Sequence, residues 1–197
     1  MRARLTLLAA ARSAPLLDTR FDDDRPLDDA GWLELRRLAP AFGPLAAAEL
    51  RYCSPSAGCR DTGRALGLAP LAQPALRDCD MGRWTGRTLR EVMALEPRAV
   101  AAWLADPFAA PHGGESLAGF IARVGSWLDT RPVPDPGRGD ASGGEGSIVA
   151  VAEPAVVRAL LCHALTASPG AYWHLDVRPL ATVALTAHAG QWTVAVT

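Results

Sequence analysis

The fold of this chain is decided near its start, by the stretch Leu5-Thr6-Leu7-Leu8-Ala9-Ala10-Ala11-Arg12-Ser13. Its apolar residues predict a buried β-strand over residues 4–9, which stops in small residues and then in a polar turn. In α/β proteins, ligands and reacting groups lie outside the carboxyl ends of the parallel strands. This strand end carries three alanines, which have no side-chain proton to give, no lone pair and no charge. The rest of the sequence must therefore show whether an active site exists here.

Length and composition exclude several classes of protein. The chain has 197 residues, a formal net charge of −1 and a pI near 6.4. One domain over residues 1–197 is expected, and nucleic-acid binding is not, because it needs a concentrated basic face. No stretch approaches the roughly 18 apolar residues of a membrane span, and the start does not resemble a targeting signal, so we expect a cytoplasmic protein without membrane contact. Four cysteines are too few for a disulfide scaffold.

Short apolar runs alternate with segments of helical periodicity along the chain. The strands are expected at residues 4–9, 48–53, 147–152, 181–187 and 191–196. The helices are expected from about 28 to 38, 56 to 66, 88 to 106 with an interruption at Pro97, 115 to 128 and 155 to 165. Residues 131–147 are rich in Pro, Gly, Asp and Ser and are interpreted as a mobile connection. This alternation predicts an α/β three-layer sandwich, with a mainly parallel sheet, an antiparallel edge and helices on both faces.

Several segments resemble, in order, the motifs of the histidine phosphatase superfamily, which is phosphoglycerate mutase-like and includes the α-ribazole phosphatases. Residues 5–13 lie where the family has L-x-L-V-R-H-G-x-T. The other matching segments are Arg20-Phe21 with Pro26 to Gly31, Tyr52-Cys53-Ser54-Pro55 with Thr62, Leu76 to Gly86, Gly113 to Leu117 with Arg123-Val124, and Val151 to Leu161. The resemblance covers almost the whole chain and implies the phosphoglycerate mutase-like fold.

The resemblance also implies a chemistry. In this family a histidine attacks phosphorus, a second histidine and two arginines hold the phosphoryl group, and a carboxylic acid protonates the leaving oxygen. The positions that carry this chemistry in the family hold other residues here. Ala9 stands at the first arginine, Ala10 at the nucleophilic histidine and Ala11 at the glycine that follows it. Gly58 stands at the second arginine, Glu153 at the second histidine, and Pro154 and Ala155 at the two glycines after that histidine. Asp78 replaces the family's glutamate with a shorter acid. The chain is therefore interpreted as a degenerate member that lacks the catalytic histidines.

Three hypotheses follow for function. The first is a pseudoenzyme, unable to use the phosphohistidine mechanism, in which a pocket lined by Ala9, Ala10, Ala11, Gly58 and Pro154 binds an unidentified small molecule or protein. A neutral, cationic or apolar ligand is expected, because the cationic side chains are gone. The protein would be a monomer or a homodimer, without a cofactor or a metal.

The second hypothesis is a repurposed enzyme. Asp78 and Glu153 would act as acid and base on a non-phosphorylated small molecule, because paired carboxyl groups can split their pKa values. His112 is a weaker candidate, on the loop that covers the site in the family. The third hypothesis is a metal or thiol site at Cys53, Cys59 and Cys79, although buried cysteines are more often small apolar core residues.

Overall fold

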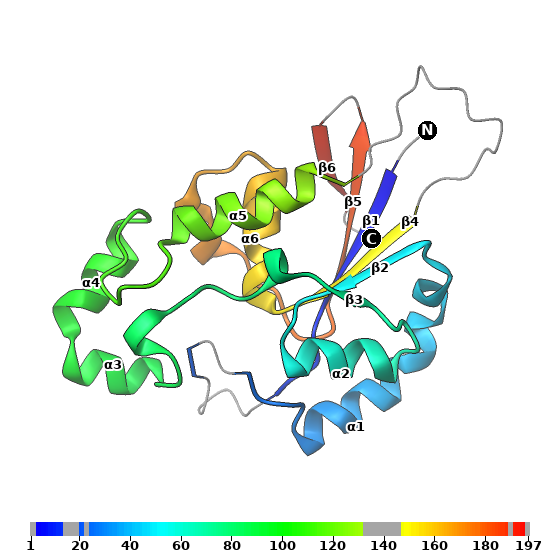
Figure 1. The fold of residues 1–197 in the computed structure, drawn as a ribbon, viewed down its shortest axis with the longest axis horizontal. Coiled ribbons are helices and arrows are strands. Elements are labelled where there is room, and N and C mark those ends of the chain that lie inside the picture. Colours follow the sequence, from blue (N-terminus) through cyan, green and yellow to red (C-terminus); the bar gives the residue numbers. More distant parts are fainter. Residues whose placement is uncertain (1–2, 14–19, 22–23, 132–146, 189–190, 196–197) are drawn as a thin grey trace.

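The computed structural model describes residues 3–13, 20–21, 24–131, 147–188 and 191–195. Its centre is a sheet with the strand order β3-β2-β4-β1-β5-β6 (Figure 1). The strands are β1 (Ala3–Ala9), β2 (Leu50–Cys53), β3 (Leu71–Ala72), β4 (Ser147–Ala152), β5 (Thr182–His188) and β6 (Gln191–Ala195). The first four strands are parallel, whereas β5 and β6 add an antiparallel edge beside β1. The predicted α/β fold class is confirmed.

The helices begin where the sequence supplies a polar cap. Asp28, Ser56, Thr88 and Ser116 each accept a hydrogen bond from a backbone amide of the first turn. The α-helices are α1 (Asp29–Leu38), α2 (Ala57–Ala65), α3 (Leu89–Leu95), α4 (Pro97–Ala105), α5 (Leu117–Asp129) and α6 (Pro154–Ala164). The 3-10 helices are η2 (Ala39–Ala47), η3 (Pro74–Leu76), η4 (Gly82–Trp84) and η5 (Pro169–His174).

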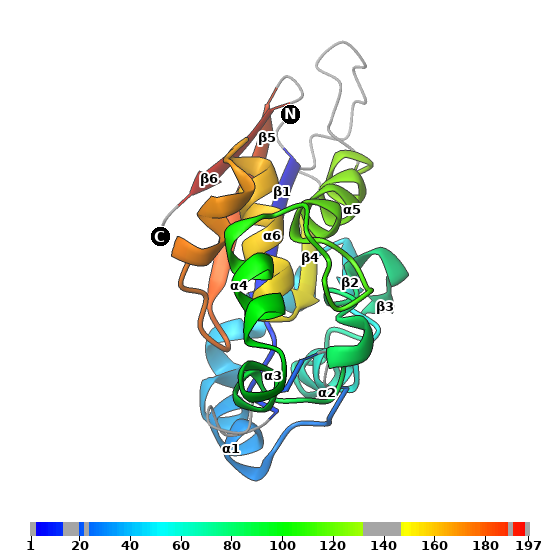
Figure 2. The same ribbon diagram turned by 90° about the vertical axis from the view of Figure 1, so that its left-hand side faces the viewer.

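The sheet is covered on both faces because β1 and β4 are apolar at almost every position. Leu5 and Leu7 of β1 belong to a core cluster that includes residues of α5 and α6. Leu8 and Ala10 belong to a second cluster, which includes Cys59 of α2 and contacts from η2. Figure 2 shows α6 lying across β1 and β4, with α5 beside it. Such continuous apolar strands are typical of a parallel sheet between two helical layers.

Several boundaries differ from the sequence prediction. The helix expected from residue 115 begins at Leu117, because Ser116 caps it, and the second strand begins at Leu50 rather than at residue 48. The short strand β3 and the helix η2 were not predicted. The helical region over 88–106 does divide in two, since Pro97 opens α4.

Parts of two predicted segments lie outside the described residues. They are most of the connection over 131–147 and the turn of the final hairpin at 189–190. Within the described part of the chain, no helix is both long and apolar enough to cross a membrane.

Candidate active site

The alanines at the end of β1 are buried, and hydrogen bonds tie their backbone to neighbouring elements. The Ala10 amide donates to the Ala152 carbonyl of β4 at 2.8 Å, and the Ala11 amide donates to the Thr62 hydroxyl of α2 at 3.1 Å. The Thr62 hydroxyl in turn donates to the Gly58 carbonyl at 2.8 Å. The strand end therefore offers no reactive side chain of its own, but it holds α2 and β4 in place.

A cavity of about 220 Å³ lies at the carboxyl ends of β2 and β4. Its lining residues are Asp24, Ser54, Pro55, Ser56, Arg77, Asp78 and Glu153. The structure thus brings the predicted pair Asp78 and Glu153 to one cavity. The lining does not include the predicted positions Ala9, Ala10, Ala11, Gly58 and Pro154. Gly58 and Pro154 lie in the first turns of α2 and α6, within two residues of the lining residues Ser56 and Glu153.

Glu153 is the residue at which β4 passes into α6. Its Oε1 accepts a hydrogen bond from the Ser54 hydroxyl at 2.9 Å, whereas Oε2 is buried with no hydrogen-bond partner among the described residues. Burial raises the pKa of the Glu153 carboxyl, and hydrogen bonds from neighbouring groups, Ser54 among them, oppose that rise only in part. A carboxylate with a raised pKa is a stronger base than an exposed glutamate.

Two helix N-termini face the same cavity. Ser56 and Glu153 are the N-cap residues of α2 and α6, and both line it. Some first-turn amides of α2 already have partners, since the Cys59 amide donates to the Ser56 hydroxyl at 3.3 Å and the Ala57 amide donates to Asp24, and Pro154 at the start of α6 has no amide hydrogen. The contribution of these helix ends is therefore the partial positive charge of the helix dipole. The two helix ends favour an anion in the cavity, and so does Arg77, which also lines it.

The loop that carries Asp78 is held by a partly buried ion pair. Arg123 of α5 contacts Glu115 through Nε at 2.9 Å and Nη2 at 2.7 Å. The same guanidinium donates to the carbonyls of Ala75, Arg77 and Asp78 at 2.8, 3.2 and 3.3 Å. Arg123 therefore connects α5 to the segment that supplies two lining residues of the cavity.

The loop around Gly82 and the loop around Gly114 pack backbone against backbone. The Arg83 amide donates to the His112 carbonyl at 3.0 Å, and the Glu115 amide donates to the Asp80 carbonyl at 2.7 Å. A Cβ at Gly114 would lie 2.1 Å from the Asp80 carbonyl oxygen, so this approach requires glycine.

His112 is packed inside this loop pair. It is 1% exposed, its Nδ1 accepts from the Gly114 amide at 3.1 Å, and its ring lies 5.0 Å from that of Trp84. Burial lowers the pKa of His112, which favours its neutral form. His112 is not among the residues that line the cavity with Asp78 and Glu153. The structure thus gives it a packing role and does not bring it to the carboxyl pair.

The cysteines are free thiols with raised pKa values. Burial is the main cause at Cys53, Cys59, Cys79 and Cys162, and Cys79 also donates to the Glu115 carbonyl at 3.5 Å. A raised pKa disfavours the thiolate, which is the form that attacks and binds metals. Among the residues that the structure describes, no cluster of three or more His, Cys, Asp or Glu side chains is arranged to hold a metal ion.

Sequence reasoning missed part of the cavity. Asp24, Ser56 and Arg77 line it, although none of them was singled out. Ser54 and Arg123 lie in segments that resemble family motifs, so the resemblance could have indicated that both residues belong to the site. Arg77 precedes Asp78 in a loop, where no periodic pattern could have indicated that Arg77 lines the cavity.

The mixed sheet, its two helical layers and a cavity at the strand ends define an α/β protein of the phosphoglycerate mutase-like class. The model of the histidine phosphatase superfamily (branch 1) matches residues 18–197, and the chain belongs to this superfamily.

One of the curated proteins similar to this chain is a phosphatase. The glucosyl-3-phosphoglycerate phosphatase of Mycobacterium tuberculosis is 33% identical over 111 residues, which are 56% of this chain and 49% of that protein. The chain spans about half the length of this curated relative.

Solved structures cover more of the chain. The native mycobacterial glucosyl-3-phosphoglycerate phosphatase superposes with a TM-score of 0.81 at 25% identity, over 100% of this chain and 98% of that one. Its complex with inorganic phosphate has a TM-score of 0.76 at 25% identity, over 98% and 96%. A putative alpha-ribazole-5'-P phosphatase from Escherichia coli shares the fold, with a TM-score of 0.80 at 21% identity over 98% and 95%.

These relatives contradict the predicted function. The pseudoenzyme that binds a ligand or protein, and the alternative enzyme for a non-phosphorylated molecule, are both wrong by this comparison, because the mycobacterial glucosyl-3-phosphoglycerate phosphatase is a phosphatase and was solved with inorganic phosphate. The prediction judged anion affinity from side chains alone. It left out the two helix N-termini and Arg77, which supply positive potential without the replaced side chains.

Proposed function

We propose that this chain hydrolyses a phosphate monoester in the cavity that contains Asp78 and Glu153. The observation that carries the proposal is the convergence of the α2 and α6 N-termini with Arg77 on that cavity. Positive potential there suits a phosphoryl dianion, and two carboxyl groups beside it can move protons. The phosphate complex of a mycobacterial relative with the same fold supports the choice of ligand.

The negative charges of the cavity are partly compensated. Asp24 accepts a hydrogen bond from the Ala57 amide at the start of α2, so its charge lies on a helix N-terminus. The Ser54 hydroxyl donates a hydrogen bond to Glu153 Oε1 and so stabilises the charge of this carboxylate. A phosphoryl group between the two helix ends therefore meets less repulsion than a count of three carboxyl groups suggests.

Water is the nucleophile in this proposal, because Ala10 has no nucleophilic atom. Glu153 takes a proton from the attacking water while the new P–O bond forms. The ester P–O bond breaks, and the Asp78 carboxyl gives a proton to the leaving oxygen. The products are an alcohol and inorganic phosphate, and the two carboxyl groups regain their starting protonation by exchange with solvent.

The test is release of inorganic phosphate from monoester substrates by the full chain. Asp78→Asn and Glu153→Gln are each expected to lower kcat/KM by about 10²-fold or more, the usual contribution of general acid or base catalysis. Asp176→Asn is the matched control, since Asp176 pairs with Arg178 on the exposed surface, and it should change kcat/KM less than about twofold.

Two results would contradict the proposal. One is the absence of both phosphate release and calorimetric binding of inorganic phosphate. The other is turnover that survives both carboxyl substitutions, which would place the reaction elsewhere.

A further inference from the structure

A second cavity, of about 240 Å³, adjoins the first one. Asp78 lines both cavities, so the two spaces are neighbours at this residue. The first cavity is lined mainly by polar side chains, whereas the second has walls of apolar and aromatic side chains. A molecule with an anionic part and an apolar part can therefore occupy both.

The aromatic wall of the second cavity is a chain of rings in edge-to-face contact. Phe21 meets Trp103 at 5.7 Å and 89°, Trp103 meets Trp173 at 4.9 Å and 80°, and Trp173 meets Tyr172 at 5.0 Å and 90°. Phe120 continues the chain at 6.5 Å from Tyr172. Perpendicular neighbours turn both ring faces and ring edges toward a bound group, and these are the geometries in which aromatic pairs are most stable.

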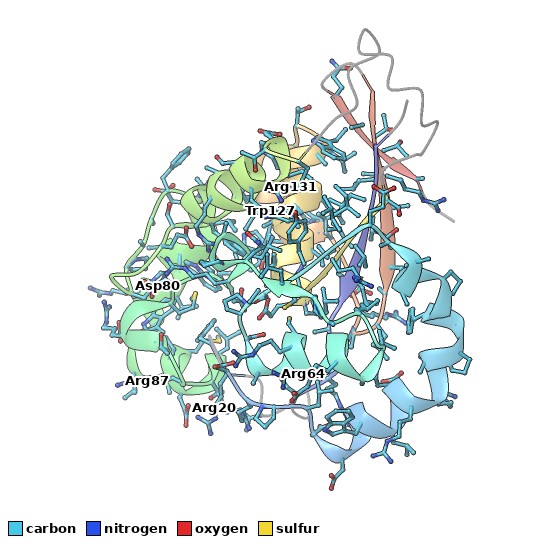
Figure 3. All side chains as sticks on the ribbon, turned by 45° about the vertical axis from the view of Figure 1, so that its right-hand side comes forward. Arg20, Arg64, Asp80, Arg87, Trp127 and Arg131 are labelled. Carbon is cyan, nitrogen blue, oxygen red and sulfur yellow. The ribbon has the colours of Figure 1, made fainter. Side chains whose placement is uncertain are left out.

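This wall is assembled from distant segments. Arg20 and Phe21 are joined to the segment before α3, because the Phe21 amide donates to the Arg87 carbonyl at 2.9 Å and Arg20 donates to the Gly86 carbonyl at 2.8 Å. Figure 3 shows Arg20 and Arg87 at the same margin of the molecule. The contacts fix Phe21 against Trp103 of α4, so the cavity wall is a built feature of the fold.

We propose that the second cavity binds the leaving group of the substrate, and that this group carries a planar aromatic ring. The inference rests on the proposed phosphate monoester hydrolysis and adds its substrate class. With the phosphoryl group between the two helix N-termini and the ring among Phe21, Trp103 and Trp173, the bridging ester oxygen lies at Asp78. That is the position at which a proton donor is needed.

A polyhydroxylated leaving group fits the second cavity less well. Each hydroxyl that loses its water without gaining a hydrogen-bond partner lowers the affinity. The charged groups along this wall are few, and Arg158 already stacks on the Tyr172 ring at 4.8 Å while donating to the Pro154 carbonyl. An aromatic ring needs no such partners and gains dispersion contacts on several sides.

The experiment compares naphthylethyl phosphate with glucose 6-phosphate. Both are esters of primary alcohols, so their leaving groups depart with similar intrinsic ease. The wild-type chain is expected to show a kcat/KM about two- to tenfold higher for the naphthyl ester, which is the gain expected from one well-placed aromatic contact beyond burial. Binding of each ester is measured in parallel by calorimetry.

Trp103→Ala should lower kcat/KM and affinity for the naphthyl ester about tenfold and leave both values for glucose 6-phosphate within about threefold. Trp173→Ala is a second variant with less risk to folding, because Trp173 is 37% exposed, and the same pattern is expected. Trp192→Ala, in β6 and outside the lining of either cavity, is the matched control and should change neither substrate.

The outcomes separate this inference from the proposed function. Equal use of the two esters, a preference for the sugar ester, or equal losses for both in Trp103→Ala would overturn the aromatic leaving group while hydrolysis stands. Selective binding of the naphthyl ester that both tryptophan variants abolish, without any turnover, would support the aromatic site and refute hydrolysis. Neither binding nor turnover of either ester would refute both.

Discussion

Arg123→Met tests whether the Arg123–Glu115 ion pair holds the loop that carries Asp78. The substitution keeps an apolar stem and removes the guanidinium, which contacts both Glu115 oxygens and three backbone carbonyls. The side chains of Arg123 and Glu115 are only 21% and 17% exposed. Glu115 would thus remain largely buried without its cationic partner.

The expected loss follows from that burial. Removing one partner of a buried pair costs about 3 to 5 kcal/mol, and partial exposure places this site at the lower end, near 3 kcal/mol. At about 2 to 4 °C per kcal/mol for a domain of this size, Tm should fall by about 6 to 12 °C. The kcat/KM for phosphate release should fall about tenfold at a temperature where the variant is folded, because Asp78 loses its fixed position.

Urea and thermal unfolding measure the first effect, and a phosphate-release assay measures the second. Arg178→Met is the matched control, since Arg178 pairs with Asp176 at 83% and 76% exposure, and it should change stability by less than about 0.5 kcal/mol. A double-mutant cycle with Glu115→Gln should show a coupling energy above about 1 kcal/mol. A coupling near zero, or a loss in Arg123→Met as small as that in the control, would refute the reasoning.

Three further outcomes follow from the structure. Burial raises the pKa of Glu153 in the folded state, so its ionisation lowers the stability of the fold as pH rises from about 4.3 through the raised value. Glu153→Gln should therefore be more stable than wild type at pH near 8, and the difference should be smaller near pH 4. Equal differences in urea unfolding at the two pH values would contradict this. Gly82→Ala should lower the free energy of unfolding by about 2 kcal/mol or more, because Gly82 has φ of 49° and a Cβ there would lie 2.4 Å from the His112 carbonyl oxygen. Gly86 has φ of 74° but lies in open space, so Gly86→Ala should lower it less in the same thermal unfolding experiment. The thiols should resist an aromatic disulfide reagent at neutral pH until the chain unfolds, since burial raises their pKa values, and rapid reaction of Cys79 in the native state would be inconsistent with this.

Local sequence patterns predict most of the helices and strands of the fold. The apolar run before Ala9 and the stripe from Leu117 to Leu128 predict β1 and α5, because side-chain periodicity depends only on residues close in sequence. The resemblance to the family, in contrast, is what predicted that Asp78, on a loop, and Glu153, after a strand, face one pocket. Strand β3 has two residues and no periodicity, so its pairing with β2 was not foreseeable.

The proposed ligand depends on groups that only the tertiary structure brings together. The sequence shows three alanines at the end of β1 and lacks the arginines and histidines that hold the phosphoryl group in the family. It therefore predicted a ligand without a phosphate group, and the phosphatase relative contradicts this prediction. The N-termini of α2 and α6 and the guanidinium of Arg77 meet only after the sheet is assembled. His112, expected near the carboxyl pair, instead packs against Trp84 under the loops.

The sequence alone therefore specifies the elements, their order and the chemistry of each strand end. The aromatic cavity, in contrast, joins Phe21, Trp103 and Trp173, which no local pattern relates to one another. The physical reason is that secondary structure follows from near neighbours, whereas the potential and the shape of a site are sums over groups that only folding brings together. Helix dipoles and backbone amides contribute to that sum without any signature in the identity of the side chains.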